Sequence, residues 1–162
     1  MKAEIGGEHA AGGLPAVTVG LPVLNEETHL PTCLEAVIGQ SYANIVEVLV
    51  ADGGSTDLTR DIVEDWPDDR VRLLENPRRI RPAGLNVCIA AAKGEIFVRV
   101  DARTKLAPDY VERCVAALER TGAAMVGGPM RFSATSAAER GVQAAMTSRI
   151  GAGPAPFRRE AA

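Results

Sequence analysis

The chain has 162 residues, of which 46% are hydrophobic and 24% are charged, and this composition is typical of one globular domain with a buried core. Its net charge of −3, its pI near 5.5 and its 4% of aromatic residues exclude a basic nucleic-acid-binding protein with base-stacking side chains. No apolar run approaches the ~18 residues of a membrane span, and the N-terminus lacks the pattern of a signal peptide.

The three cysteines, Cys33, Cys88 and Cys114, are widely spaced and lie in apolar segments. Their odd number and their spacing argue against a disulfide framework or a zinc site. We therefore expect buried free thiols in a reducing compartment, which favours a cytoplasmic protein.

The N-terminal part of the chain predicts a strand followed by a helix. Residues 1–15 contain many Gly and Ala and have no periodicity, so we expect a flexible tail. Residues 16–21 read A-V-T-V-G-L and predict a short strand that ends at Pro22. Apolar residues then recur at helical spacing between residues 30 and 40, which predicts an amphipathic helix.

Residues 46–60, V-E-V-L-V-A-D-G-G-S-T-D-L-T-R, carry the clearest local pattern. The β-branched residues predict a strand that ends at Asp52, and the two glycines after it allow a sharp turn. Ser55 or Thr56 can then cap a helix, which we expect over residues 58–66. Asp52 would thus lie at the carboxyl end of a parallel strand, where open α/β sheets bind ligands. Alternatively, it only closes the turn of an ordinary βα connection.

A basic segment, E-N-P-R-R-I-R-P-A-G-L-N, occupies residues 75–86. Its prolines argue against a regular element at its start, and helical spacing is clear only over residues 85–92. One interpretation is a loop that faces a diphosphate, because guanidinium groups match phosphate geometry. The other is a solvated cluster of charges. The arginines concerned are Arg78, Arg79 and Arg81.

Further strands are predicted at residues 71–74 and 95–100, and the second of these runs directly into Asp101. A helix is then expected from Pro108 to Gly122, since proline is common at a helix start and glycine at its end. The apolar residues 123–126 predict one more strand.

We expect three parts along the chain. They are the tail at residues 1–15, an α/β half-domain at residues 16–132 and a poorly defined segment at residues 133–162. Within that last segment, residues 133–148 can hold a helix, whereas residues 150–162 show no core pattern. The sequence has no internal repeat.

Asp52 and Asp101 each follow a predicted parallel strand, and the basic segment lies between them in sequence. The chain has no Walker-type phosphate loop, no dinucleotide-binding glycine pattern and no serine nucleophile elbow. A nucleoside diphosphate bridged by a divalent ion fits the two carboxylates better, because Mg²⁺ and Mn²⁺ prefer carboxylate and phosphate oxygens.

Three motifs in this order, V-T-V-G-L-P-V-L-N-E-E, V-A-D-G-G-S-T-D-L-T and G-E-I-F-V-R-V-D-A-R, resemble those of the family 2 glycosyltransferases. The most similar type is the succinoglycan-biosynthesis type of exopolysaccharide transferase, and the resemblance covers residues 17–129. It implies the GT-A fold, a three-layer α/β sandwich with a mostly parallel central sheet, here incomplete at the C-terminus. It also implies an inverting transfer of a sugar from a UDP-sugar to a glycan or lipid-linked acceptor in polysaccharide biosynthesis. The longer relative would associate peripherally with the inner face of the membrane.

The resemblance also implies the binding residues. In the family, the loop corresponding to residues 22–26 and the first acidic site bind the uridine, and a strand-end Asp-x-Asp binds the metal and the diphosphate. The implied donor-binding residues are Pro22, Asn25, Glu26, Asp52, Arg79, Arg81, Asn86 and Asp101. Asp101 is also the implied ligand of Mg²⁺ or Mn²⁺.

The chain departs from the family pattern at both acidic sites. A second carboxylate often follows the first, but here Gly53 follows Asp52. The metal motif is Asp101-Ala102-Arg103, and Arg103 cannot ligate a metal, although its charge can itself contact a phosphate. We therefore expect Asp101 to hold the ion alone on the protein side, and only weakly without nucleotide.

The family's catalytic base, often followed by Gln-x-x-Arg-Trp, lies further along the chain, and the only tryptophan here is Trp66. None of the later carboxylates follows a predicted strand; they are Asp109, Glu112, Glu119, Glu139 and Glu160. We therefore expect a donor-binding half that is truncated before its base and does not turn over by itself. Two alternatives stay open: a non-catalytic nucleotide-sugar-binding remnant, and a nucleotidyltransferase, which would need a Gly-rich basic loop where this chain is acidic.

Overall fold

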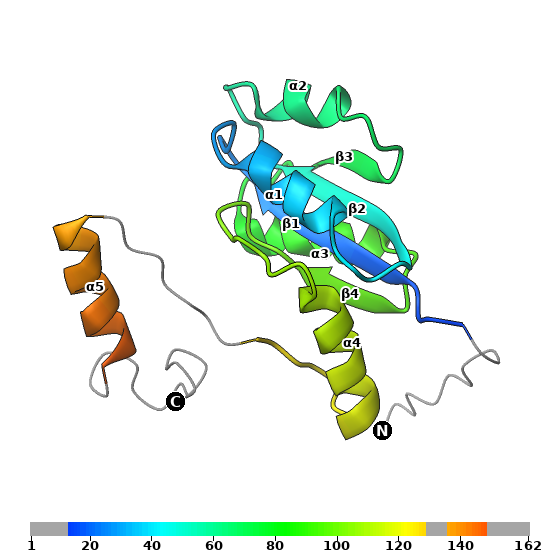
Figure 1. Ribbon diagram of the computed structural model, residues 1–162. Coiled ribbons are helices and arrows are strands. Elements are labelled where there is room, and N and C mark those ends of the chain that lie inside the picture. Colours follow the sequence, from blue (N-terminus) through cyan, green and yellow to red (C-terminus); the bar gives the residue numbers. More distant parts are fainter. Residues whose placement is uncertain (1–12, 129–135, 149–162) are drawn as a thin grey trace. The chain divides into compact units, whose positions relative to one another are not determined.

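The computed structural model describes residues 13–128 and 136–148 (Figure 1). The chain divides into two compact units, residues 1–115 and residues 116–162, and each is described by itself. Most of the predicted N-terminal tail and the predicted patternless end at residues 150–162 lie outside the described residues. The three-part domain organisation therefore stays a prediction.

The described helices and strands alternate along the first unit, and one more helix follows. In chain order they are β1 (Val17–Val23), α1 (Leu30–Ile38), β2 (Ile45–Asp52), α2 (Thr59–Glu64), β3 (Val71–Glu75), α3 (Arg81–Ala91), β4 (Ile96–Arg99), α4 (Tyr110–Thr121) and α5 (Ala137–Thr147).

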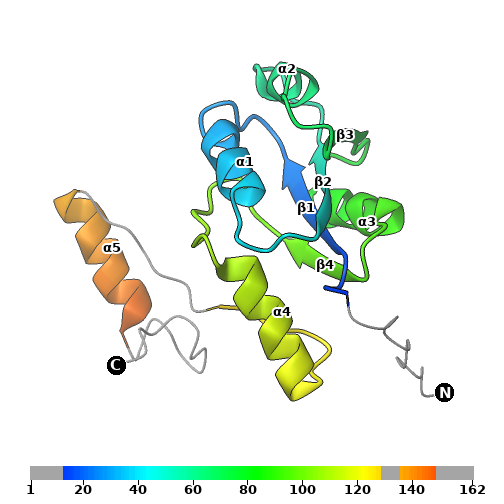
Figure 2. The same ribbon diagram turned by 45° about the vertical axis from the view of Figure 1, so that its right-hand side comes forward.

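In the described part of the chain, four parallel strands form one sheet in the order β3-β2-β1-β4 (Figure 2). A helix lies between each strand and the next in sequence, as crossovers between parallel strands require. The chain builds outward from β1 to β2 and β3, and α3 then carries it back so that β4 pairs with the other side of β1. The predicted α/β fold with a mostly parallel central sheet is confirmed.

The larger hydrophobic cluster joins one face of the sheet to α1, α2 and α4. Alternate residues of a strand point to one face, and Val17, Val19 and Leu21 of β1 accordingly share this cluster. Each fully buried side chain of this size contributes about 1.5–3 kcal/mol relative to exposure, so this face supplies much of the apolar stabilisation. Its fully buried members include Leu30, Leu34, Val37, Val48, Val50 and Val111.

Helix α3 covers the opposite face of the sheet and packs on β1 and β2 (Figure 2). Leu49 and Cys88 are fully buried in this smaller cluster. At Gly20 of β1, an added Cβ would stand 2.3 Å from Cζ of Phe97 and 3.1 Å from Cβ of Cys88. A larger residue would force α3 or β4 away from β1, so this glycine permits the close packing of the helix on the sheet.

Two predicted elements have different beginnings. Helix α3 begins at Arg81 and not at Leu85, because Pro82 occupies its first turn, where a missing N–H leaves no hydrogen bond unmade. Helix α2 begins at Thr59, and neither Ser55 nor Thr56 caps it. That capping prediction is wrong, and the contacts that these two residues make instead are described below.

The strand predicted over residues 123–126 is absent from the described residues, where this segment is irregular. Met125 is 87% exposed and Val126 is only partly buried, so this apolar run is not part of the buried core. The prediction of a strand here is therefore wrong. By contrast, α5 lies within residues 133–148, where the sequence predicts a helix.

A buried carboxylate at the amino ends of the strands was not predicted. Glu47 of β2 accepts a hydrogen bond from the Thr18 hydroxyl at 2.8 Å and one from the Lys93 backbone N–H at 2.6 Å. Arg72 of β3 adds a contact of 3.1 Å to the other carboxylate oxygen. Glu47 thus joins β1, β2, β3 and the α3–β4 connection.

The cysteines are free, and burial raises the pKa of both Cys33 and Cys88 to about 11. These two thiols are therefore protonated near neutral pH, as expected for buried cysteines. Cys114 is partly buried. Among the described residues, no helix has the length and apolar character needed to cross a membrane.

Candidate functional site

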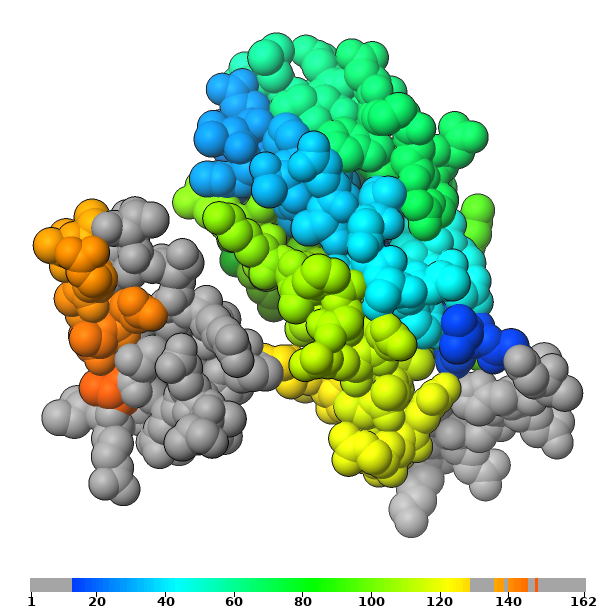
Figure 3. Space-filling view, in the orientation of Figure 1, coloured from blue at the N-terminus to red at the C-terminus, as the bar shows by residue number. Residues whose placement is uncertain are grey.

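The segments that follow β1 and β4 meet at one edge of the sheet. The chain runs from β1 to β2 and β3 on one side of β1, and α3 then brings it back so that β4 lies on the other side; the edge beyond β1 and β4 is therefore the kind of switch point where open α/β sheets bind ligands. In the space-filling view, the blue loop after β1 and the yellow-green segment after β4 lie side by side (Figure 3). The Arg103 side chain joins them through Glu26, at 3.0 Å.

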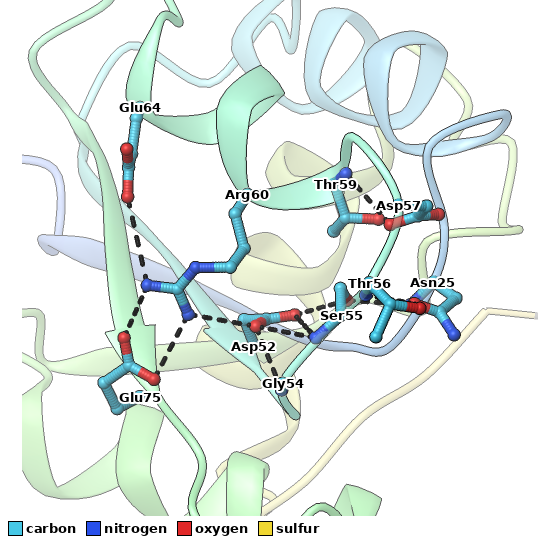
Figure 4. Close-up of polar contacts among 10 residues, drawn as sticks. All are labelled: Asn25, Asp52, Gly54, Ser55, Thr56, Asp57, Thr59, Arg60, Glu64 and Glu75. Atoms are coloured by element: carbon cyan, nitrogen blue, oxygen red, sulfur yellow. Dashed lines mark hydrogen bonds and ion pairs between the residues drawn. The ribbon is translucent and has the colours of Figure 1, made fainter.

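Asp52 is the last residue of β2, and its side chain is fully buried. Its carboxylate accepts hydrogen bonds from the backbone N–H of Gly54 at 3.0 Å and of Ser55 at 3.1 Å, and from the Ser55 hydroxyl (Figure 4). Gly54 has a φ of +82°, a conformation that glycine adopts without strain. The carboxylate thus closes the βα turn, which was one of the two interpretations of this residue.

The ionised form of Asp52 is favoured by this arrangement. Burial by itself raises the pKa of the carboxyl, but the hydrogen bonds from Ser55, Arg60 and Gly54 outweigh burial and hold the pKa below its usual range. A contact between Asp52 and the nucleoside of a donor stays a prediction, because the side chain is enclosed by its own turn.

Arg60, in the first turns of α2, was not singled out by the sequence. Its guanidinium donates to Asp52 at 3.1 Å and to Glu75, at the end of β3, at 2.6 Å (Figure 4). Glu64 of α2 lies 3.9 Å from the same group. The hydrogen bond from Arg60 lowers the pKa of Glu75. Because Arg60 bonds both carboxylates, it joins the ends of β2 and β3. A residue eight positions beyond Asp52 becomes its partner only because α2 folds back over the sheet.

The loop after β1 and the turn after β2 are joined by reciprocal hydrogen bonds. Asn25 accepts from the Thr56 N–H at 2.8 Å, and its own N–H donates to the Ser55 hydroxyl at 2.8 Å. Its φ of +52° is the left-handed conformation that asparagine tolerates better than most residues. The Glu26 N–H donates to the hydroxyl of Thr59 at 2.8 Å.

Two carboxylates in these loops bind backbone N–H groups at the start of α2. Glu27 accepts from the Leu58 N–H at 3.0 Å, and Asp57 accepts from the N–H of Thr59 at 3.0 Å and of Glu27 at 3.1 Å. Burial raises the pKa of Asp57, but these hydrogen bonds more than offset it, so its pKa is lowered. The loops after β1 and β2 therefore form one connected substructure.

The basic segment divides between this substructure and the loop after β4. Arg79 has a φ of +56°, and an atom added to Gly54 as Cβ would stand 3.3 Å from Nε of Arg79. Its guanidinium therefore lies over the βα turn. Arg81, the first residue of α3, lies 3.7 Å from the Asp101 carboxylate. Arg78 is exposed.

The segment after β4 presents Asp101 among cations. Arg99 donates to both of its carboxylate oxygens at 3.1 Å, in addition to the Arg81 contact. Two residues later, Nε of Arg103 donates to both carboxylate oxygens of Glu26 at 3.0 Å. The two acidic groups at the switch point are thus each paired with a guanidinium.

These residues do not fit a metal site of the Asp-x-Asp type. The only carboxylate of that motif, Asp101, is already bonded to Arg99, and Arg103 stands where the second carboxylate would be. Among the described residues, no group of three or more His, Cys, Asp or Glu side chains is placed to hold a metal ion. Asp101 as the ligand of Mg²⁺ or Mn²⁺ stays a prediction, and the surrounding cations do not favour it.

The two other predicted site residues lie on α3 and beneath it. Pro22 is buried in β1, and Asn86 is exposed on α3. Near them is Asn76, which follows β3 and was not singled out by the sequence. Its N–H donates to the backbone oxygen of Asp52 at 2.8 Å, and its buried Oδ1 has no partner in the described structure. An asparagine after a short strand carries no sequence signal that separates it from a turn residue.

A family model described as "Glycosyl transferase family 2" matches residues 18–158. The chain is 34% identical over 142 residues to "Succinoglycan biosynthesis protein ExoA" of Rhizobium meliloti (strain 1021), which aligns 85% of this chain with 43% of that protein. It is also 34% identical over 124 residues to "Glycosyltransferase AglE" of Haloferax volcanii, with 74% of this chain and 41% of that protein covered. The chain therefore spans less than half the length of these relatives.

Solved structures of glycosyltransferases share the fold. The mannosyltransferase PcManGT from Pyrobaculum calidifontis, in complex with GDP-Man and Mn²⁺, superposes with a TM-score of 0.57 at 34% identity, over 64% of this chain and 32% of that one. S. aureus TarS in complex with UDP superposes with a TM-score of 0.58 at 21% identity, over 72% of this chain and 39% of that one, which supports the fold alone. The implied GT-A fold is thereby confirmed. Because the family model matches most of this chain, the chain belongs to glycosyl transferase family 2.

Proposed function

We propose that this chain binds the nucleoside diphosphate part of a UDP-sugar at the carboxyl edge of its sheet. The wider activity would be transfer of that sugar to a glycan or lipid-linked acceptor in polysaccharide biosynthesis. A lipid-linked acceptor would bring the protein to the inner face of the membrane, and we include peripheral association there in the proposal.

One observation carries the proposal. The loop after β1 and the turn after β2 form a single hydrogen-bonded substructure, and Arg79 of the basic segment lies over it, while Arg81 lies beside Asp101 in the segment after β4. A rigid polar floor with cations at its border suits a nucleoside joined to a diphosphate. The complex of PcManGT with GDP-Man, at 34% identity, supports the same class of ligand, a nucleoside diphosphate joined to a sugar.

Each residue has a definite part in this proposal. Asp52 holds the turn that lies beneath the nucleoside position, Asn25 joins the two loops and lines that position, and Arg79 and Arg81 face the diphosphate. These groups bind and orient the donor, and no step of the proposal passes through a metal. Binding in this way would fix the sugar at the edge of the sheet, ready for an acceptor.

Titration calorimetry with UDP and GDP tests the proposal. We expect saturable UDP binding that Arg79→Gln weakens roughly tenfold to hundredfold, the usual effect of losing a hydrogen bond to a charged group. Lys93→Ala is the matched control, because it removes one exposed positive charge before β4, at the amino ends of the strands. This variant should bind UDP as the wild type does.

Comparing UDP with GDP distinguishes the proposed uridine donor from the more general proposal of a nucleotide-sugar site. Tighter binding of GDP than of UDP would keep a nucleotide-sugar site but contradict the uridine donor. If the folded protein bound neither nucleotide, the proposal as a whole would be contradicted. If Arg79→Gln and Lys93→Ala weakened UDP binding equally, the basic segment would not be part of the site.

A further inference from the structure

Arginines outnumber carboxylates where the loops after β1 and β4 meet. Arg81, Arg99 and Arg103 face the two acidic side chains, Glu26 and Asp101. Three guanidinium groups against two carboxylates leave a net positive charge at this point of the sheet edge. A divalent cation brought here would be repelled by that excess, and it would also have to displace a guanidinium from each carboxylate.

Exposure shows which of these groups can reach a ligand. The side chains of Arg103 and Arg81 are 70% and 62% exposed, whereas that of Glu26 is only 12% exposed. The Glu26 carboxylate therefore acts as an anchor behind Arg103. The bond to Glu26 uses Nε, and the two Nη groups of Arg103 make no hydrogen bond within the described structure. A guanidinium held in this way presents a pair of free donors outward, which is the geometry that binds phosphate oxygens.

The backbone fixes the start of this arrangement. Val100 N–H donates to the Gly20 oxygen at 3.0 Å, and the Thr104 N–H donates to the Asp101 oxygen at 2.8 Å. Ala102, between the two functional positions, is buried. The segment therefore forms a turn anchored to β1, and Arg103 occupies the position where the family pattern has the second carboxylate of its metal motif.

We propose that this chain binds the donor diphosphate through the guanidinium groups of Arg103 and Arg81, in place of a divalent metal ion. The inference rests on the proposed nucleotide-sugar site and goes beyond it, because it assigns the charge-neutralising role to protein side chains. Glu26 and Asp101 act as positioning residues that hold the two arginines. The Mn²⁺ of the PcManGT complex would have no counterpart here.

The test is titration calorimetry with UDP in EDTA and in MnCl₂, using the whole chain. We expect wild-type affinity to change less than about twofold between the two buffers. Arg103→Gln should weaken UDP binding roughly tenfold to hundredfold in both buffers, since it removes a charged hydrogen-bond donor without adding charge. Lys93→Ala again serves as the control and should behave as the wild type.

A second variant restores the family motif. Arg103→Asp recreates Asp-x-Asp, and we expect its UDP affinity to be at least about tenfold higher in MnCl₂ than in EDTA, because two carboxylates and a diphosphate can share the ion. Electron paramagnetic resonance should then show bound Mn²⁺ in this variant with UDP, but not in the wild type. Circular dichroism checks that each variant is folded. If Arg103→Asp does not fold, Arg103→Gln still tests the inference.

Three outcomes would overturn the inference. Wild-type UDP binding that requires Mn²⁺ would do so while leaving the proposed nucleotide-sugar site intact. Unchanged affinity of Arg103→Gln in EDTA would show that Arg103 does not contact the diphosphate. No UDP binding in either buffer would contradict the inference and the proposed function together.

Discussion

Asp52 stays ionised although its side chain is fully buried. Because its pKa differs between the folded and the unfolded chain, the stability of the protein depends on pH. Its pKa in the folded chain lies below the value of about 3.9 expected for the unfolded chain. A lowered folded-state pKa contributes stability above the unfolded-state pKa, and this contribution is lost as the pH falls through the folded-state pKa.

Asp52→Asn should therefore lower the free energy of unfolding by ~1–3 kcal/mol at pH 7, because charged hydrogen bonds to the turn and to Arg60 become neutral ones. The difference from the wild type should narrow below about pH 4, as the wild-type carboxyl takes up a proton. Urea unfolding at pH 7 and below about pH 4 measures this difference in unfolding free energy. Asp69→Asn, at an exposed position, is the control. A difference that widens on acidification would contradict this account of Asp52.

The position of Asp52 could be predicted from the sequence, but its partners could not. A run of β-branched residues that stops at Asp-Gly-Gly locates the strand end from local pattern alone. Arg60 and Asn25 reach it only through the packing of α2 and of the loop after β1, which are non-local contacts. The same limit hid the pairing of Arg103 with Glu26, residues that are distant in sequence.

The loop after β1 and the turn after β2 act as one element, and Asn25 is the residue that tests this. Asn25→Gly keeps the left-handed backbone but loses the hydrogen bond from the Thr56 N–H, so it should cost ~1 kcal/mol of unfolding free energy. Asn25→Ala loses the same bond and also strains a backbone with φ of +52°, so it should cost ~1–2 kcal/mol more than glycine does.

Urea denaturation followed by the fluorescence of Trp66, which packs against the core, measures both variants. Thr28→Ala provides a control in the same loop, since Thr28 is exposed. If alanine proved no worse than glycine at position 25, the left-handed conformation of this loop would be disproved.

Regular elements were predictable where the pattern and the packing agree. The strands β1 and β2 have dense β-branched residues and are buried, so local propensity and tertiary contacts favour the same structure. Residues 123–126 have an apolar pattern but pair with no strand in the described part of the chain, and an apolar run without a partner does not form sheet. At α3 the prolines argue against a helix at its observed start, although one of them occupies the first turn, where proline is tolerated.

For the whole molecule, the strand order β3-β2-β1-β4 decides where a ligand can bind. The sequence predicted parallel strands with carboxylates at two of their ends, but spacing alone does not give the order of strands in a sheet. The order brings the loop of Glu26 beside the loop of Asp101 and Arg103 at the switch point. The family resemblance implies that residues 22–26 and Asp101 bind the same donor, but the strand order and the bond between Arg103 and Glu26 come from the structure.

If UDP binds at the carboxyl edge of this sheet, as we propose, chemical-shift mapping will locate it there. A ¹⁵N-labelled chain titrated with UDP should show saturable amide shifts in the segments that follow the four strands. These are residues 22–29, 52–58, 76–81 and 100–105. Amides near Glu47 and Lys93, at the opposite edge, should not move. Saturable shifts confined to that opposite edge, or no saturable shifts at all in the folded protein, would contradict the claim.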